Sequence, residues 1–111
     1  MPFDANLAER IRQRLAGLDA REVAMFGGRS FMVHDQLAVC AASDGSLLLR
    51  CAPDEADRLV RRQGARPAEM RGKAMSPGWL RVDVDAVVDD VVLHDWIDAA
   101  VAHADQRAQT R

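Results

Sequence analysis

Hydrophobic residues recur at helical spacing close to the start of the chain. They lie three or four positions apart, so they line one face and predict an amphipathic helix over residues 4–16. Asp4 is a suitable N-cap residue for this helix, and Gly17 is a suitable residue to end it. The residues that share the face are Leu7, Ile11, Leu15 and Leu18.

From Glu22 onward the pattern changes to a period of two, which is typical of strands. The runs EVAMF (22–26) and RSFMV (29–33) flank Gly27 and Gly28, and two glycines permit the positive φ angles of a type I′ hairpin turn. A phosphate-binding loop would require a helix directly after the glycines, whereas RSFMV continues as a strand. The pattern therefore favours a hairpin turn over an anion-binding loop.

A second hairpin is predicted around Asp44 and Gly45, between LAVCAAS (37–43) and SLLLRCA (46–52). With a two-residue loop both faces of this hairpin are apolar, so a helix or another subunit is expected to cover the second face. One face would carry Ala38, Cys40, Ala42, Leu47, Leu49 and Cys51, and the other Leu37, Val39, Ala41 and Leu48.

The same register places Cys40 opposite Leu49 and makes Cys40 and Cys51 diagonal neighbours on one face. Diagonal neighbours have Cα atoms about 7 Å or more apart, which is at or beyond the reach of an unstrained disulfide. We therefore expect two reduced thiols, buried among apolar side chains.

The second half of the chain predicts a helix, two strands and a final helix. A proline followed by acidic residues predicts a helix over residues 53–62, and AEMRGKAM (68–75) and WLRVDV (79–84) predict two strands. An apolar stripe predicts the final helix from about Asp89, with a tail that frays from about residue 106. The stripe consists of Leu93, Trp96, Ile97, Ala100, Val101 and Ala104.

Length and composition indicate one soluble domain that spans residues 1–111, because 49% of the residues are hydrophobic and 29% are charged. No apolar run approaches the roughly 20 residues that cross a bilayer. The first residues also lack the basic-then-apolar order of a secretory signal. We expect a cytoplasmic protein with no membrane contact.

Charge is unevenly distributed, although the net charge is only −2. Residues 50–73 contain seven basic and four acidic residues, a balance of +3, whereas residues 82–106 contain seven aspartates and no lysine or arginine. An aspartate-rich helix repels phosphate, so we expect no direct specific binding to DNA. The basic residues of 58–66 follow the acidic start of a predicted helix, an order that suits the helix dipole and favours a structural role over a binding patch.

The sequence contains no recognisable set of catalytic groups, and it contains no tyrosine. His94 lies four residues from both Asp90 and Asp98 and could join them at a divalent ion, but solvated helix charges are the commoner explanation. We expect no catalytic, cofactor or metal site and no enzymatic activity. The alternative is an anion-binding protein or enzyme that uses Arg29, Arg50, Arg71 and Lys73 on adjacent strands.

Four segments, in order, resemble the N-terminal domain of the TfoX/Sxy family over roughly residues 3–105. They are MFGGRSFMV, DGSLLLRCAPDE, RPAEMRGKAMSPGWLRVD and LHDWIDAAVAHA. The shared positions are Phe26, Gly27, Gly28, Phe31, Arg50, Pro67, Met70, Gly72, Met75, Gly78, Trp79 and Trp96. The resemblance implies a two-layer α+β domain with an antiparallel sheet of about five strands, in the order α-β-β-β-α-β-β-α.

The resemblance also implies a function, because longer members of that family are bacterial competence regulators thought to act with the cyclic-AMP receptor protein. They carry a second, C-terminal domain, and we expect this chain to be a stand-alone N-terminal domain without it. A regulatory adaptor that acts through protein contacts, and a homodimer, are the expectations. The candidate partner surface is Phe26, Gly27, Gly28, Arg29, Arg50, Met70, Arg71, Lys73, Met75 and Trp79.

The surroundings of Trp79 distinguish the two functional hypotheses. An adaptor requires an exposed apolar groove, whereas a small-ligand site requires a closed pocket with convergent polar groups.

Overall fold

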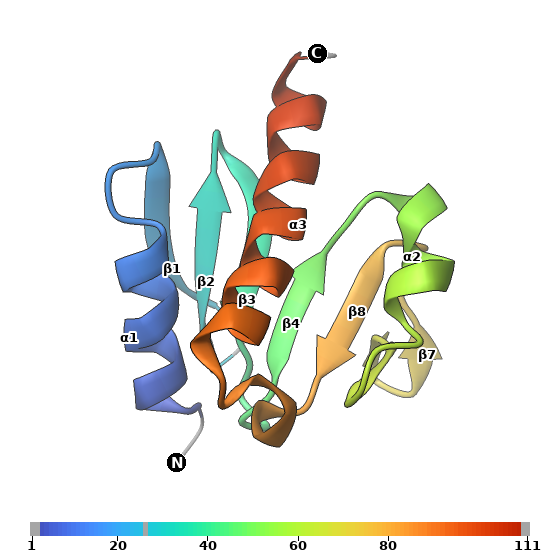
Figure 1. Ribbon diagram of the computed structural model, residues 1–111. Helices are drawn as coiled ribbons and strands as arrows, with labels where there is room; N and C mark the ends of the chain where they lie inside the picture. Colours follow the sequence, from blue (N-terminus) through green and yellow to red (C-terminus); the bar gives the residue numbers. More distant parts are fainter. Residues whose placement is uncertain (1–2, 26, 110–111) are drawn as a thin grey trace.

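The computed structural model describes residues 3–25 and 27–109, except for the side chain of Met70. A six-stranded antiparallel sheet of order β1-β2-β3-β4-β8-β5 carries the helices on one face (Figure 1). The elements are α1 (Ala5–Arg14), β1 (Ala20–Met25), β2 (Gly28–Val33), β3 (Gln36–Ala41), β4 (Leu47–Arg50), α2 (Pro53–Leu59), β5 (Ala65–Pro67), β6 (Glu69–Met70), β7 (Lys73–Ala74), β8 (Trp79–Val82), the short 3-10 helix η1 (Val84–Val87) and α3 (Asp90–Gln109).

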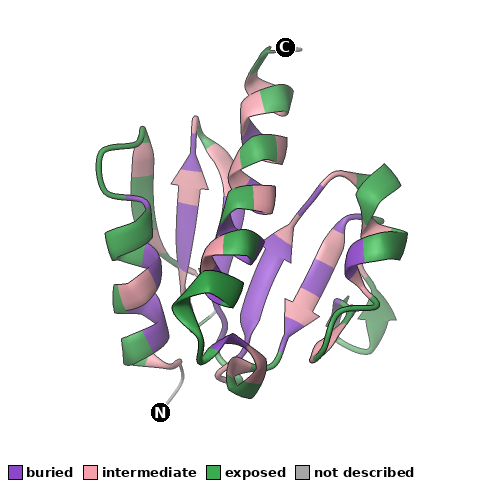
Figure 2. Cartoon of the chain, viewed as in Figure 1, coloured by how far each residue is buried: buried purple, intermediate pink, exposed green. Residues whose placement is uncertain are grey.

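The predicted α+β class is confirmed, and the element order is confirmed in outline. The structure has four strands before α2 rather than three, and the main sheet has six strands rather than about five. The additional strand arises because each of the two predicted hairpins supplies two strands. Figure 2 shows that β4 is buried along most of its length, whereas β7 is exposed.

Helix α1 begins where the sequence predicts, because the Asp4 carboxylate accepts a hydrogen bond from the Leu7 N–H at 2.9 Å. Leu7, Ile11 and Leu15 are buried. Leu18 instead is 48% exposed, since it follows Gly17, whose φ of +88° turns the chain away from the helix axis.

The turn between β1 and β2 differs from the predicted one. Met25 pairs with Gly28, so the two loop residues are 26 and 27; Phe26 lies outside the described residues. Gly27 has a φ of +77°, but Gly28 does not adopt a left-handed conformation. Gly28 is instead required by close approach, because a Cβ placed there would lie 2.4 Å from the carbonyl oxygen of Ala41 on β3.

The predicted register of the second hairpin is wrong by one residue. Ala42 donates its N–H to the carbonyl of Ser46 at 2.9 Å, which leaves a three-residue loop with Gly45 at a φ of +91°. Cys40 therefore pairs with Leu48 rather than with Leu49.

This register puts the two cysteines on opposite faces of the sheet rather than on one face. Cys51 belongs to the core beneath the helices, and Cys40 belongs to a smaller apolar cluster on the other face. Both cysteines are free and buried, as predicted.

The main core lies between the sheet and the helices. Val39, Leu47 and Leu49 project from the central strands into it and are at most 1% exposed. Trp96 of α3 is fully buried against them, and the Arg62 guanidinium lies 5.3 Å from the centre of a Trp96 ring.

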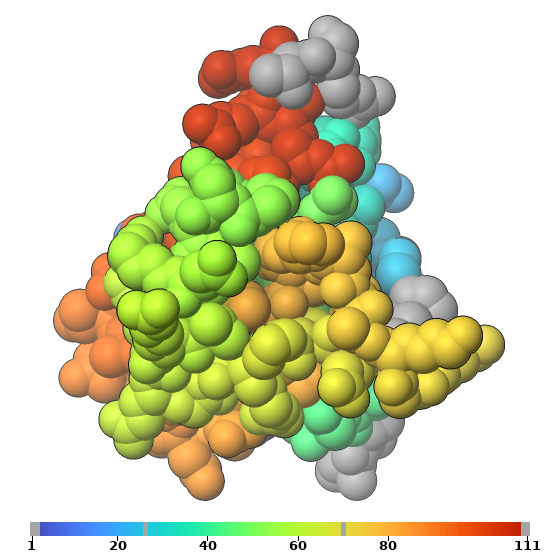
Figure 3. Space-filling view, turned by 90° about the vertical axis from the view of Figure 1, so that its right-hand side faces the viewer, coloured from blue at the N-terminus to red at the C-terminus, as the bar shows by residue number. Residues whose placement is uncertain are grey.

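The segment AEMRGKAM forms a hairpin of its own rather than the single predicted strand. Strands β6 and β7 pair with each other, and Arg71 and Gly72 between them have φ angles of +56° and +78°. Two adjacent positive φ angles are the geometry that the sequence analysis assigned to Gly27 and Gly28. This hairpin, yellow in Figure 3, projects from the body of the molecule.

Helix α3 is held to α1 by paired charges. Arg10 contacts Asp90 at 2.8 Å, and Arg14 contacts Asp98 at 2.7 Å. The helix spans Asp90–Gln109. Among the described helices none is long and apolar enough to cross a membrane.

We predict that Gly28→Ala lowers the free energy of unfolding by about 1–3 kcal/mol, because the new methyl group must displace the Ala41 carbonyl. Thermal melting should show a decrease of several degrees. Gly17→Ala is the control: it places a side chain in open space and incurs only left-handed strain. A Gly28→Ala variant that melts like the parent would contradict the close approach.

Candidate functional site

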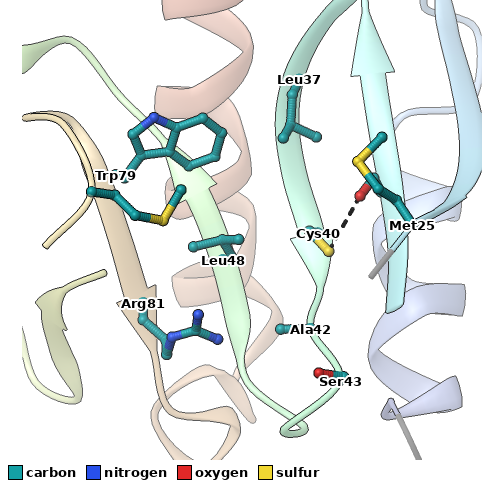
Figure 4. Close-up of a pocket in the computed structure, with 10 residues that line it drawn as sticks. Met25, Leu37, Cys40, Ala42, Ser43, Leu48, Trp79 and Arg81 are labelled. Carbon is teal, nitrogen blue, oxygen red and sulfur yellow. Dashed lines mark hydrogen bonds between the residues drawn. The ribbon is translucent and has the colours of Figure 1, made fainter. Parts of the chain in front are cut away.

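The sheet face opposite the helices contains a groove of about 350 Å³ (Figure 4). Its floor is made of buried side chains: Ser30, Cys40, Ala42 and Leu48. Its walls are partly exposed side chains: Met25 and Leu37 on one side, and Met75 and Trp79 on the other. Ser43 and Arg81 line the end nearest the β3–β4 loop.

An irregularity in β3 brings Leu37 and Cys40 to the same face, although they are an odd number of residues apart. Phe31 pairs with Val39 and Met32 pairs with Leu37, so Ala38 is an extra residue on β3. Such a bulge reverses the alternation of side chains along one strand. Leu37 thereby joins the groove wall (Figure 4).

The β6–β7 hairpin and its flanks cover only one side of this face. Ala68 donates to the Trp79 carbonyl and accepts from the Met75 N–H, both at 3.0 Å, and Ala68 is 1% exposed. These bonds hold Met75 and Trp79 as one wall of the groove. Trp79 and Met25 lie on opposite sides of the groove, with Leu48 and Cys40 between them (Figure 4).

The positive charge of Arg81 is balanced by an ion pair with Asp44. Its Nη1 lies 3.2 Å from both carboxylate oxygens of Asp44 and 3.0 Å from Ser46 Oγ. Burial alone would raise the pKa of Asp44, but hydrogen bonds from Ser46 and the charge of Arg81 lower that pKa below its ordinary value. Because Asp44 is ionised beside it, Arg81 is not a free receptor for an anionic ligand.

Cys40 contributes a weakly polar atom to the floor of the groove. Burial raises the pKa of the Cys40 thiol, while the Ser30 hydroxyl, which donates to Cys40 Sγ at 3.4 Å, partly opposes this. The raised pKa and the 7% exposure of Cys40 favour a neutral thiol.

Arg50 flanks the other end of the groove. It pairs with Trp79 across β4 and β8, and its guanidinium lies 5.4 Å from the centre of a Trp79 ring. Its Nε atom is buried without a hydrogen-bond partner. Within residues 3–25 and 27–109, no carboxylate forms an ion pair with Arg50.

The residues that the sequence analysis assigned to a partner surface are only partly brought together. Met75 and Trp79 line the groove, and Arg50 flanks it. A Cβ on Gly27 would lie 3.3 Å from Ser43 Cβ, so this turn lies beside one groove end. Arg71 and Lys73 are on the β6–β7 hairpin; Phe26 and the Met70 side chain lie outside the described part.

Arg29 is separated from the other three basic residues of the anion hypothesis. Its side chain lies on the helix face, 5.4 Å from the centre of the Phe3 ring and 3.8 Å from Glu22. Glu22 itself is bonded to Arg12 of α1. Arg29 therefore does not converge with Arg50 on a common ligand.

The metal hypothesis has no geometric support, because Asp90 and Asp98 are directed to the arginines of α1. In the described part of the chain, no group of three or more potential ligands is close enough to hold a metal ion.

Four residues of the groove were not predicted from the sequence: Met25, Leu37, Leu48 and Arg81. The available signal was the doubly apolar second hairpin, which indicated a second covered face. The bulge at Ala38 and the three-residue loop could not be inferred from it.

In a comparison with protein families, the model of the TfoX N-terminal domain matches residues 13–104. The chain belongs to the TfoX N-terminal domain family. No curated protein matches the chain. The family match covers every strand of the sheet and hence all residues that line the groove.

We predict that Cys40 of the folded protein is alkylated at least about tenfold more slowly near neutral pH than the same residue in the unfolded chain. The reason is its raised pKa, which reduces the thiolate fraction, together with its burial. Iodoacetamide labelling followed by peptide mass spectrometry measures both rates. Equal rates in the folded protein and in urea would show that the groove floor is open to solvent.

Proposed function

We propose that this TfoX N-terminal domain is a non-enzymatic regulatory adaptor that binds a protein partner in the groove. The observation that carries the proposal is the open apolar groove beside Trp79 on a sheet face without helices. Exposed apolar surfaces of this kind mark sites of protein contact. Met25, Leu37 and Met75 supply the flexible and branched apolar walls that such contacts use.

The alternative of an anion-binding protein or enzyme has less support. It requires polar groups that converge on a ligand, whereas Arg29 lies on the opposite face and Arg81 is paired with Asp44. The groove lining is mainly apolar, and its thiol is neutral at physiological pH.

The proposed setting is competence or related transcriptional regulation in the bacterial cytoplasm, with the cyclic-AMP receptor protein as a candidate partner. The family relationship supports this proposal. In this setting the partner contacts the DNA, because this chain has a net charge of −2 and a final helix without basic residues before Arg107.

We predict that the double substitution Met25→Gln and Leu37→Gln abolishes the regulatory role while the protein remains folded. Both side chains are already partly exposed, so their replacement should cost little stability. Transcript profiles of cells that carry the variant should match those of a deletion strain, and circular dichroism should match the parent. Binding of purified cyclic-AMP receptor protein, measured by titration calorimetry, should be lost in parallel.

Val91→Gln is the matched control, because Val91 is an exposed apolar residue on α3, away from the groove. It should behave as the parent in both measurements. If the deletion strain has altered transcripts but the strain with Met25→Gln and Leu37→Gln has the transcripts of the parent, the proposed role of the groove is contradicted.

We also propose that the domain forms a homodimer through the β1 edge of the sheet. The two edges differ: β1 has six residues, whereas β5 has three and ends in Pro67, which cannot donate to a neighbouring strand. Because a two-residue loop is closed by a hydrogen-bonded pair, Met25 and Val23 bond to β2, and the backbone of Ala24 points outward.

We predict that light scattering at micromolar concentration gives twice the chain mass for the parent and the single-chain mass for Ala24→Pro. Proline at Ala24 removes an outward N–H but no bond to β2, so the fold should persist. A parent protein that remains monomeric at high concentration would contradict the dimer.

A further inference from the structure

Two arginines on the groove face differ in availability. Arg81, at the β3–β4 end, is bonded to Asp44 and Ser46. Arg50, at the opposite end, is stacked on Trp79 and has no carboxylate partner in the described residues. The positive charge at the Trp79 end of the groove is therefore uncompensated.

The β6–β7 hairpin lies beside Arg81, at the opposite end of the groove from Arg50, because Arg81 Nη2 lies 3.5 Å from the Glu69 carbonyl oxygen and Gly72 lines a hollow together with Asp44 and Arg81. This hairpin carries Arg71 and Lys73, neither of which forms an ion pair in the part of the chain that the structure describes. Glu69 is the single acidic residue of that hairpin. The uncompensated charge at the Trp79 end of the groove is therefore supplied by Arg50, although the whole chain is net negative.

We propose that the groove binds an apolar segment of a partner protein that carries a carboxylate side chain, and that Arg50 receives this carboxylate. The inference rests on the proposed function and adds the chemistry of the partner. Apolar side chains of the segment contact Leu48 and Cys40 on the floor, while the carboxylate lies beside the guanidinium above Trp79.

The contact with the Trp79 ring pre-organises the Arg50 guanidinium for this role. The guanidinium is held against the Trp79 ring and its Nε is already desolvated, so less side-chain freedom is lost when a carboxylate binds. A planar guanidinium also accommodates two parallel hydrogen bonds to a carboxylate. The complementary occupant therefore combines negative charge with apolar bulk.

A nucleic acid does not meet these requirements, because a phosphate backbone would leave the apolar floor unfilled and would face the charge of Asp44 at the other end. The volume of about 350 Å³ lies near the lower end of ligand sites, which span about 300–1,000 Å³, and suits a few side chains of a peptide.

The test is a selection of short random displayed peptides on the full chain, followed by binding measurements with the selected synthetic peptides. We expect enrichment of Asp or Glu close to large apolar residues. Emission of Trp79 reports occupancy, because the other tryptophan, Trp96, is fully buried and the chain contains no tyrosine. Each acidic peptide is compared with an analogue that has Gln or Asn in place of the acid.

Arg50→Gln should lower the affinity for the acidic peptide about tenfold and leave the affinity for its amide analogue unchanged, because only the acidic peptide loses a charge-assisted hydrogen bond. Arg50→Lys should restore part of the affinity. Arg62→Gln is the matched control, because Arg62 stacks on Trp96 in the same way on the helix side. Its binding should equal that of the parent.

Selected peptides that bind the groove without acidic residues, or that lose equal affinity with Arg50→Gln and Arg62→Gln, would overturn this inference and leave the proposed function standing. If no selected peptide loses affinity when Met25→Gln and Leu37→Gln are introduced, both this inference and the proposed function are overturned. Competition of the peptide with self-association would show that a second copy occupies the groove, and would also overturn the inference.

Discussion

The pairing of Cys40 with Leu48 across β3 and β4 decides what each face of the sheet carries. Side chains alternate along a strand, so a shift of one residue would exchange the two faces of β4. In the observed register Leu47 and Leu49 join Val39 and Ala41 beneath the helices, and Leu48 joins Cys40 on the other face. The three-residue loop that ends in Gly45 fixes this register, and both the core and the groove depend on it.

Local signals in the sequence predicted most of the helices and strands, but they did not predict how the strands pair. The Asp4 cap, the helical stripe of α3 and the two early hairpins follow from spacing and from turn residues. The register of β3 and β4 was wrong because Asp44-Gly45 fits both a two-residue and a three-residue loop. Gly28 was assigned to a turn, but glycine is required there because the Ala41 carbonyl, on a strand more than ten residues away in the sequence, leaves no room for a Cβ. At the site, the sequence identified Met75, Trp79 and Arg50. It did not identify Leu37, because the bulge at Ala38 changes the face on which Leu37 lies.

Covering one face of the sheet with all three helices leaves apolar residues on the other face without a partner element. The β6–β7 hairpin and its flanks cover them in part, through the backbone hydrogen bonds of Ala68 and through the packing of Met75 against the apolar cluster of Cys40, Ala42 and Leu48. A full layer on this face would bury Met25 and Leu37, which are only partly buried. The groove is thus a direct consequence of the one-sided arrangement of α1, α2 and α3.

Stability and recognition are carried by different residues on the groove face. The floor residues Cys40 and Leu48 are buried by the sheet itself, so they contribute to folding whether or not a partner is present. The wall residues are only partly buried, and the Arg50 guanidinium has no carboxylate partner among the described residues, so their replacement should disturb the folded chain less than replacement of a floor residue. Substitutions along the walls can therefore change which segment binds without changing the register of β3 and β4 that creates the groove.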